Sequence, residues 1–379
     1  MNKVSSIKGL AVVCLLSTLA FISCKPEPIE EPLAPLTRKL ILPESPYNYS
    51  NIVLPEHWDN MALNLFENIP SFNETTDEGA TLGRVLFHDV NLSIDQTISC
   101  ESCHQQAAAF SDNHQFSTGI HGAQTVRNSM SITNMTYARR FFWDRRVSGL
   151  ENQVLIPIEH PEEMGLSLEY MVNRIETSSE YPPLFMAAFG DSDVTSDRVA
   201  RALSQYIRSI YSYRSKYDDG FVIDFTNFTE EELMGKSIFF NGETNCNQCH
   251  MTVVFFSPSA MNNGLDLEYA DNGVSNQTGN PEDAGEFKVV TLRNLGFTAP
   301  YMHDGRFATL EEVVEHYNSG LAAHPNITDQ LTVESQIGGT PLQMGLTEEE
   351  KTALVAFLHT LDDYELISDV RYSNPFVWE

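Results

Sequence analysis

Two short motifs carry the most specific chemistry in the sequence. They are Cys100-Glu-Ser-Cys103-His104 and Cys246-Asn-Gln-Cys249-His250, and both match the pattern C-x-x-C-H. At this spacing two thiols reach the two vinyl groups of one haem, and the adjacent histidine reaches its iron. Zinc would need a fourth ligand that neither motif supplies, and a redox dithiol would not need the histidine. The sequence therefore predicts two covalently attached c-type haems.

The second axial ligand of each iron decides what such a protein can do. An electron carrier fills both axial positions, whereas an enzyme must free one of them for its substrate. The two motif histidines fill only one position each. The function must therefore be sought in residues outside the motifs.

Helices must position both motifs. Leu82–Phe87 and Met234–Phe239 repeat one pattern ahead of each cysteine pair, with apolar residues three and four apart and a glycine suited to close helix crossing. Capping boxes at Thr229–Glu232 and Thr347–Glu350 mark helix starts. Closing helices are expected over 198–211 and 351–361. The fold class predicted is mainly α, with two cytochrome c-like helical domains, each around one covalently bound haem.

The N-terminus has the pattern of an export signal. Two lysines precede the apolar run Leu10–Ile22, which is too short to span a bilayer. Ser23 followed by Cys24 resembles the bacterial lipobox, so residues 1–23 are expected to be removed and Cys24 to carry lipid. The alternatives are ordinary cleavage near Ser23 or a short membrane anchor. The protein is expected on the periplasmic side or in the cell envelope, touching membrane only through this lipid.

The remaining chain divides at its composition changes. Residues 24–58 are rich in proline and acid and are predicted to form a tether. The N-terminal haem domain is predicted over 59–222 and the C-terminal haem domain over 223–379, because so long a chain exceeds what one core usually supports. The Asn-, Gly- and Asp-rich stretch 262–285 is expected to be a functional insertion or a mobile flap.

Charge restricts the partners. The formal net charge is −29, which disfavours nucleic acid and anionic membranes and favours a basic protein partner. A homodimer is kept as a candidate assembly.

A longer set of motifs resembles the bacterial di-haem cytochrome c peroxidase and MauG family. The matching stretches, in order, are Leu82–Asp89, Ser99–His104, Arg127-Asn128, Phe142–Asp144, Gln153, Pro157–Glu159, Glu163–Gly165, Phe287–Asn294, Thr298–Gly305 and Thr309–Asn318. They lie between about residues 60 and 362. A set of this length in the right order is far more specific than either haem motif alone.

The resemblance gives the two haems different roles. It implies that the haem on His104 reacts with peroxide and that the haem on His250 stores and relays electrons, with Trp143 between them. Gln153 and Glu163 match the distal pair, in which a carboxylate accepts the first proton of peroxide and delivers it to the leaving oxygen. Without the resemblance, Trp143 would be read as a core aromatic and Glu163 as a solvated acid.

Two further positions concern the second axial ligands. His121 lies where some family members place a removable ligand to the first iron, and a surface histidine is the alternative. Tyr317 lies fourteen residues after His303, where peroxidases with a high-potential centre have methionine and MauG has tyrosine. A tyrosine ligand implies a low reduction potential. Met302, His303 and His316 are rival ligands, and helix packing is the other reading of Tyr317.

The resemblance also implies a calcium ion, held at the domain interface by Asn128, Thr298 and Pro300 through oxygen atoms. Three residues depart from the family pattern. Arg145 replaces a glycine, Val290 a proline and His88 an aromatic residue, and Arg145 puts the geometry near the haem edge in doubt.

The sequence is consistent with three candidate functions. The first is reduction of hydrogen peroxide to water with electrons from a small cytochrome c or another redox protein. The second is a MauG-like oxidase that acts on a protein or organic substrate through a high-valent di-haem state, which Tyr317 favours. The third is a di-haem electron-transfer protein, against which His121, Gln153 and Glu163 argue.

Overall fold

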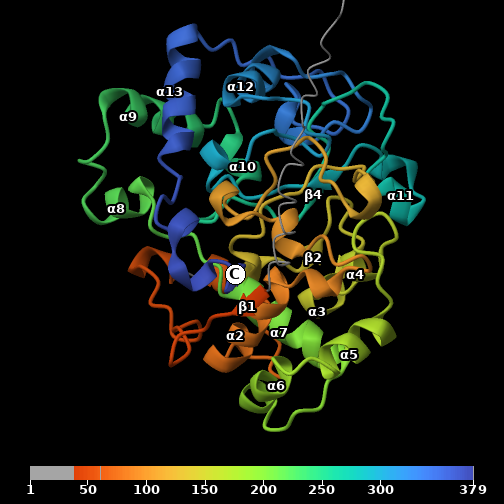
Figure 1. The fold of residues 1–379 in the computed structure, drawn as a ribbon. Helices are drawn as coiled ribbons and strands as arrows, with labels where there is room; N and C mark the ends of the chain where they lie inside the picture. The colour runs from red at the N-terminus through yellow and green to blue at the C-terminus, as the bar shows by residue number, and fades with distance from the viewer. Residues whose placement is uncertain (1–37, 60, 379) are drawn as a thin grey trace, which may run out of the picture.

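Helices dominate the computed structural model, which describes residues 38–59 and 61–378 (Figure 1). The predicted signal segment, residues 1–23, and Cys24 lie outside the described residues. The helices are α1 Met61–Asn64, α2 Asp77–His88, α3 Leu150–Gln153, α4 Ile156–Glu159, α5 Leu168–Glu176, α6 Tyr181–Phe189, α7 Ser196–Arg208, α8 Lys216–Val222, α9 Glu230–Phe240, α10 Cys246–Cys249, α11 Ser275–Thr278, α12 Leu310–Ser319 and α13 Glu348–His359. The strands are β1 Arg38–Leu40, β2 Arg140–Phe141, β3 Val147–Ser148, β4 Ala260–Met261, β5 Phe287–Lys288 and β6 Phe376–Trp378. They form three antiparallel pairs, β1 with β6, β2 with β3, and β4 with β5.

The same helix crossing occurs twice. In α2, a Cβ atom added to Gly83 would lie 2.0 Å from the carbonyl oxygen of Ala202 in α7. In α9, a Cβ atom added to Gly235 would lie 1.8 Å from the carbonyl oxygen of Ala353 in α13. Only glycine permits backbones to approach this closely. The predicted repeat and the role of its glycines are confirmed.

Side-chain caps set the helix starts in the second half. Thr229 accepts from the backbone N–H of Glu232, whose carboxylate accepts from the backbone N–H of Thr229. Thr347 and Glu350 make the same reciprocal pair at the start of α13. Each cap satisfies two backbone donors that the helix leaves unpaired. Both predicted capping boxes are confirmed.

Two hydrophobic clusters form the main cores. The first joins α2, α5, α6 and α7, and the second joins α8, α9, α12 and α13. In Figure 1 the helices of the first lie below and most of those of the second lie above. The two cysteine pairs belong to different clusters, because Cys100 packs against the first and Cys246 against the second.

Both ends of the described chain join the first core. Strands β1 and β6 pair with Leu40 opposite Phe376, so the C-terminus lies beside β1 (Figure 1). Tyr49 and Tyr372 are buried in this core. Residues 38–58 are therefore packed against the body, so the tether predicted over 24–58 is wrong for these residues. The reason is that aromatic residues between the prolines bury enough apolar surface to order the segment.

The stretch 262–285 is folded onto the protein. It lies between the paired strands β4 and β5 and contains α11. Arg127 binds Asp271 in this stretch and also Asp144, at 2.6 and 2.7 Å. The segment also brings Asn263 to a large internal cavity. Among the described residues no helix combines the length and apolar character needed to cross a bilayer.

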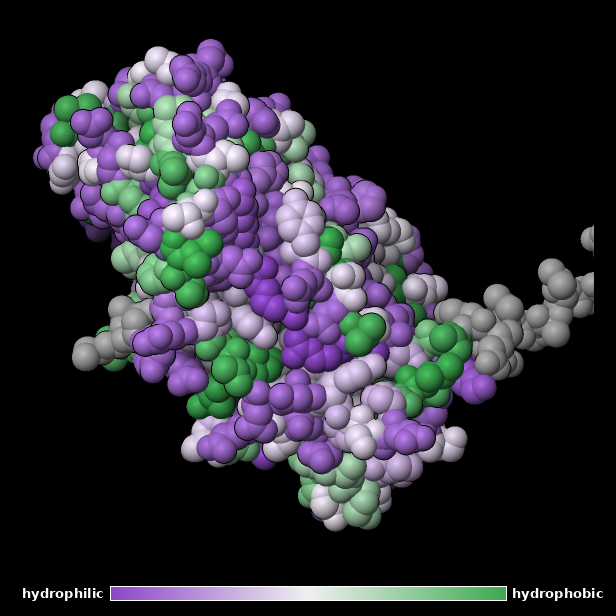
Figure 2. Space-filling model, turned by 90° about the vertical axis from the view of Figure 1, so that its left-hand side faces the viewer, coloured by the Kyte–Doolittle hydropathy of each residue, from purple (hydrophilic) through white to green (hydrophobic). Residues whose placement is uncertain are grey.

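One face of the protein is mainly hydrophilic. Figure 2 shows apolar side chains as separate patches on one largely polar face.

Candidate haem sites and active site

The second C-x-x-C-H motif opens onto a cavity of about 200 Å³. Both cysteines and His250 line it, as do many apolar side chains from α9, α12 and α13. His250 donates from Nδ1 to the carbonyl oxygen of Phe255, at 3.2 Å, which leaves the lone pair on Nε2. Burial lowers the pKa of His250 to about 4. The imidazole is therefore neutral, which is the form that binds a metal.

Tyr317 lines the same cavity from α12. Its hydroxyl lies 3.5 Å from the amide nitrogen of Asn263, and burial raises its pKa to about 12. Met302 and His303 also line the cavity, whereas His316 bonds through Nε2 to the carbonyl oxygen of Asn263 at 3.1 Å. Met344, which the sequence did not predict, lines the cavity too. No local motif marks it, because it reaches the cavity only through the fold.

The donor set of this cavity fits a c-type haem. Two thiols, a neutral imidazole and a phenol face one apolar space. One buried cation, the ammonium nitrogen of Lys288, lies in the lining and has no hydrogen-bond partner in the described parts of the chain. A haem would present apolar faces to the lining and carboxylates to such a cation.

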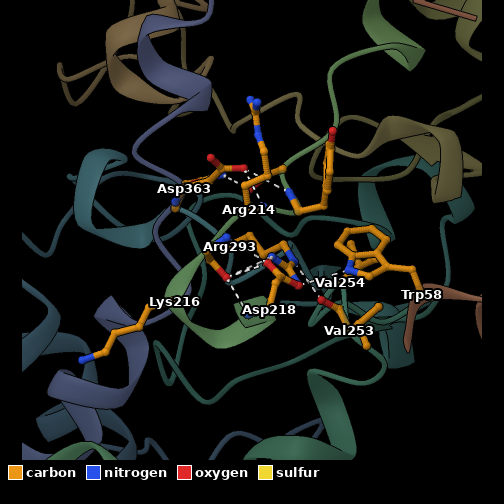
Figure 3. A network of polar contacts seen from close by, with 12 residues as sticks. Trp58, Arg214, Lys216, Asp218, Val253, Val254, Arg293 and Asp363 are labelled. Carbon is orange, nitrogen blue, oxygen red and sulfur yellow. Dashed lines mark hydrogen bonds and ion pairs between the residues drawn. The ribbon is translucent and has the colours of Figure 1, made fainter. Parts of the chain in front are cut away.

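A buried polar network holds the loop that follows His250 in the chain (Figure 3). Arg293 binds both carboxylate oxygens of Asp218 at 2.8 Å and donates from Nε to the carbonyl oxygen of Val253 at 2.7 Å. Trp58 donates its indole N–H to Asp218 at 3.1 Å. Because Val253 is two residues before Phe255, this network fixes the chain that orients the His250 ring. No local sequence pattern marks this network, since its members are far apart in the chain.

The first C-x-x-C-H motif has the same local arrangement. Cys100–Ser102 form a short 3-10 turn, and His104 donates from Nδ1 to the carbonyl oxygen of Phe110 at 3.0 Å. Burial lowers the pKa of His104 and raises the pKa values of the Cys100 and Cys103 thiols to about 12 and 11. The imidazole again offers Nε2 in the neutral form.

Glu163 lies near the first motif. Its charge acts on the thiols of Cys100 and Cys103, and its backbone carbonyl accepts from the N–H of Ile120 at 2.9 Å. Burial raises the pKa of Glu163 above the ordinary carboxylate range, while His160, at 3.7 Å, acts in the opposite direction. A carboxyl group with a raised pKa is suited to exchanging protons.

The described contacts of Gln153 and His121 do not tie either residue to the first C-x-x-C-H motif. Gln153 is the last residue of α3, and no hydrogen bond between described residues joins it to Glu163. The His121 side chain is 75% exposed, with Nδ1 3.8 Å from a carboxylate oxygen of Asp95. In this structure His121 faces solvent beside that acid.

Trp143 links the two halves. Its indole N–H donates to the carbonyl oxygen of Asn128 at 2.8 Å, and its ring lines the cavity of the second motif, edge-on to His303. Phe142, the residue before it, packs on the first core. The indole thus lines the second cavity, while the residue before it in the chain packs on the first core.

The oxygen atoms expected to hold calcium come from two segments. Asn128 donates from its backbone N–H to the carbonyl oxygen of His303 at 2.8 Å, and from its amide to the carbonyl oxygen of His114 at 3.1 Å. Thr298 is buried, and Pro300 lies two residues further on. Within the described ranges, no three His, Cys, Asp or Glu side chains are grouped to hold a metal ion.

The structure shows the contacts of His88 and the backbone conformation of Arg145, two residues that depart from the family pattern. His88 is buried and bonds to Glu101 at 2.8 Å and to the carbonyl oxygen of Tyr372 at 3.2 Å. Arg145 has a φ of 56°, in the left-handed region that favours glycine. The backbone shape at Arg145 thus suits the glycine that it replaces. The third departure, Val290, lines the cavity.

Together, the two motifs, each with a buried neutral histidine, define a di-haem c-type protein. The model of the family described as di-haem cytochrome c peroxidase matches residues 77–222. The methylamine utilization protein MauG of Methylorubrum extorquens is 31% identical over 297 residues, which cover 77% of this chain and 80% of the relative. The cytochrome c551 peroxidase of Nitrosomonas europaea is 32% identical over 286 residues, which cover 74% and 79%.

A solved structure agrees with these relatives. The crystal structure of a MauG-like protein associated with microbial copper homeostasis superposes with a TM-score of 0.74 at 34% identity, covering 84% of this chain and 99% of that one. The chain belongs to the di-haem cytochrome c peroxidase and MauG family. Membership implies two c-type haems and an oxidoreductase of the peroxidase kind.

Proposed function

We propose that the protein reduces hydrogen peroxide to water at the first haem, with electrons from a small cytochrome c or another redox protein. The observation that carries this proposal is the position of Glu163, half-buried near the first motif with a raised pKa. A plain electron carrier has no use for an acid-base group there. Each helical half would surround one haem, as in a pair of cytochrome c-like domains.

The bound haems would supply an iron for peroxide and a second iron that stores electrons. In its ionised form, the Glu163 carboxylate takes the proton of the incoming peroxide and then returns it to the departing oxygen. Gln153 orients the peroxide by hydrogen bonding. Trp143, held by the carbonyl oxygen of Asn128, keeps an aromatic ring in the path between the sites.

Tyr317 supports a second candidate. Its phenol lines the cavity of the second motif, and a tyrosine ligand stabilises oxidised iron. A centre that is hard to reduce suits a MauG-like oxidation of a protein or organic substrate better than rapid electron storage. The relative named MauG is about as similar as the relative named cytochrome c551 peroxidase.

One assay separates these candidates. Purified protein carrying both haems is mixed with hydrogen peroxide and a reduced small basic cytochrome c, whose oxidation is followed by absorbance. Peroxidase activity requires sustained turnover that falls about 10²- to 10⁴-fold in Glu163→Gln. A long-lived oxidised state without turnover would favour the second candidate. Two low-spin haems inert to peroxide would eliminate both enzymes and leave the electron carrier.

Calcium binding is proposed for Asn128, Thr298 and Pro300, whose carbonyl and amide oxygens suit a hard cation. Equilibrium dialysis should detect one Ca²⁺ per chain, lost after treatment with a chelator. Absence of Ca²⁺ uptake by the chelated protein would end this proposal.

Export and lipid anchoring through Cys24 follow from the signal and lipobox pattern. Mass spectrometry of the mature N-terminus should find acylated Cys24. An unmodified terminus, or retention of residues 1–23, would contradict the anchor.

A further inference from the structure

Lys288 is the cation that the proposed chemistry leaves unexplained. It is the last residue of β5, and its backbone N–H donates to the carbonyl oxygen of Trp143 at 2.8 Å. Its side chain lines the cavity of the second motif and also a smaller cavity bounded by residues 130–138. The ammonium nitrogen is buried and has no hydrogen-bond partner among the described residues.

A buried ammonium without a partner is costly. Leaving a charged donor unpaired costs several kcal/mol, so such groups are normally paired or neutralised. The centroid of the Phe141 ring lies 5.6 Å from the ammonium nitrogen, and a cation–π contact at this distance is too weak to offset burial. Burial and the charge of Arg145 together lower the pKa of Lys288 to about 8.

Arg145 is a second cation, close enough for its charge to act on Lys288. It lies two residues after Trp143 and is half-buried, and no described hydrogen bond or ion pair engages its guanidinium group. Glu286 is the acid whose charge acts on it, yet the two form no ion pair. The φ of 56° is one that glycine would adopt without strain.

Two neighbouring cations without an anion repel each other, and both would be stabilised by one carboxylate between them. We propose that Lys288 and Arg145 form a cationic clamp for a propionate carboxylate of the haem held by the second C-x-x-C-H motif. The cavity that Lys288 lines contains the residues that would bind this haem, so no other anion is needed. Arg145 makes the clamp a feature of this chain, because the family pattern has glycine there.

The clamp requires haem attachment but not peroxide turnover, so it is tested without peroxide. The first variant is Lys288→Met, with Lys288→Arg as the charge-conserving variant. Lys236→Met is the matched control, because Lys236 lies over Phe225 at 3.8 Å and does not line the cavity. Haem content is measured first, so that only protein carrying two haems is compared.

Two readouts are taken from each variant. Spectroelectrochemical titration gives the midpoint potential of the second haem, and resonance Raman spectra give the propionate bending bands. Removing the cation leaves the carboxylate charge uncompensated, which favours ferric iron. Lys288→Met should lower the midpoint potential and shift the propionate bands. Lys288→Arg and Lys236→Met should match the unmodified protein.

Unchanged potential and unchanged bands in Lys288→Met with two haems would overturn the clamp. Should this variant fail to fold, Arg145→Gly provides the same test, since glycine suits the backbone at that position. Arg145→Gly should shift both readouts in the same direction by a smaller amount, and no shift would overturn the proposal. Peroxide turnover can fail in every variant without affecting either outcome, which separates the clamp from the proposed function.

Discussion

Asp218 and Arg293 form a two-pronged ion pair inside the protein, with both N–O distances at 2.8 Å and side chains only 2% and 0% exposed. Burial alone would raise the pKa of Asp218, but the Arg293 guanidinium holds it well below its usual range. Removing one partner leaves an uncompensated buried charge. Asp218→Asn should therefore lower the free energy of unfolding by about 3–5 kcal/mol, measured by urea denaturation.

The same pair predicts a pH dependence. A carboxyl group with a lowered pKa stabilises the fold above its unfolded pKa, and this contribution is lost as the pH falls towards its folded pKa. The unmodified protein should thus lose stability below about pH 4 more steeply than Asp218→Asn. Parallel stability curves for the two proteins would show that the Asp218 carboxylate is not stabilised by Arg293.

Gly83 and Gly235 should be intolerant of alanine. An added Cβ would lie 2.0 Å from the carbonyl oxygen of Ala202 or 1.8 Å from that of Ala353, so the helices would have to separate. Gly83→Ala and Gly235→Ala should each cost about 1–3 kcal/mol in denaturation experiments. Gly242→Ala is the control, because nothing lies within 4 Å of its added Cβ. A loss no larger than that of the control would mean that the crossings adjust freely.

Local signals made much of the fold predictable from the sequence. The C-x-x-C-H motifs, the two capping boxes and the glycine repeat each depend on residues a few positions apart. The closing helices expected over 198–211 and 351–361 correspond to α7 and α13. The pairing of β1 with β6 gave no such signal, because three-residue strands at opposite ends of the described chain have no local pattern to connect them.

The residues of the site likewise fall into those that the sequence could predict and those that it could not. His250 was predicted from its motif and Tyr317 from the family resemblance, and both line one cavity. Asp218 and Arg293 are 75 positions apart, and a single acid among many carries no mark of its partner. Lys288 belongs to one of the matching motifs. That its ammonium nitrogen is buried without a partner among the described residues depends on packing, which the sequence does not show.

Glu163 should set the acid limb of peroxide turnover. Because burial raises its pKa, the carboxylate becomes protonated at a higher pH than an exposed glutamate and can no longer accept a proton from peroxide. The ratio kcat/KM should therefore fall as pH drops through a value above about 4.3, the ordinary glutamate pKa. The limb should be absent from the residual activity of Glu163→Gln. If the acid limb of Glu163→Gln lies at the same pH as that of the unmodified protein, another group causes it.

Tyr317 should control the potential of the second haem. A phenolate favours ferric iron, whereas a thioether favours the ferrous state, so Tyr317→Met should raise the midpoint potential. Tyr317→Phe should also raise it and should remove any phenolate-to-iron charge-transfer band from the spectrum. His316→Phe serves as the control, since His316 bonds to the carbonyl oxygen of Asn263. Should His316→Phe, and not Tyr317→Phe, change the spectrum, the rival histidine would be the ligand. If Tyr317→Met also turns over peroxide faster with reduced cytochrome c, tyrosine at this position limits electron storage.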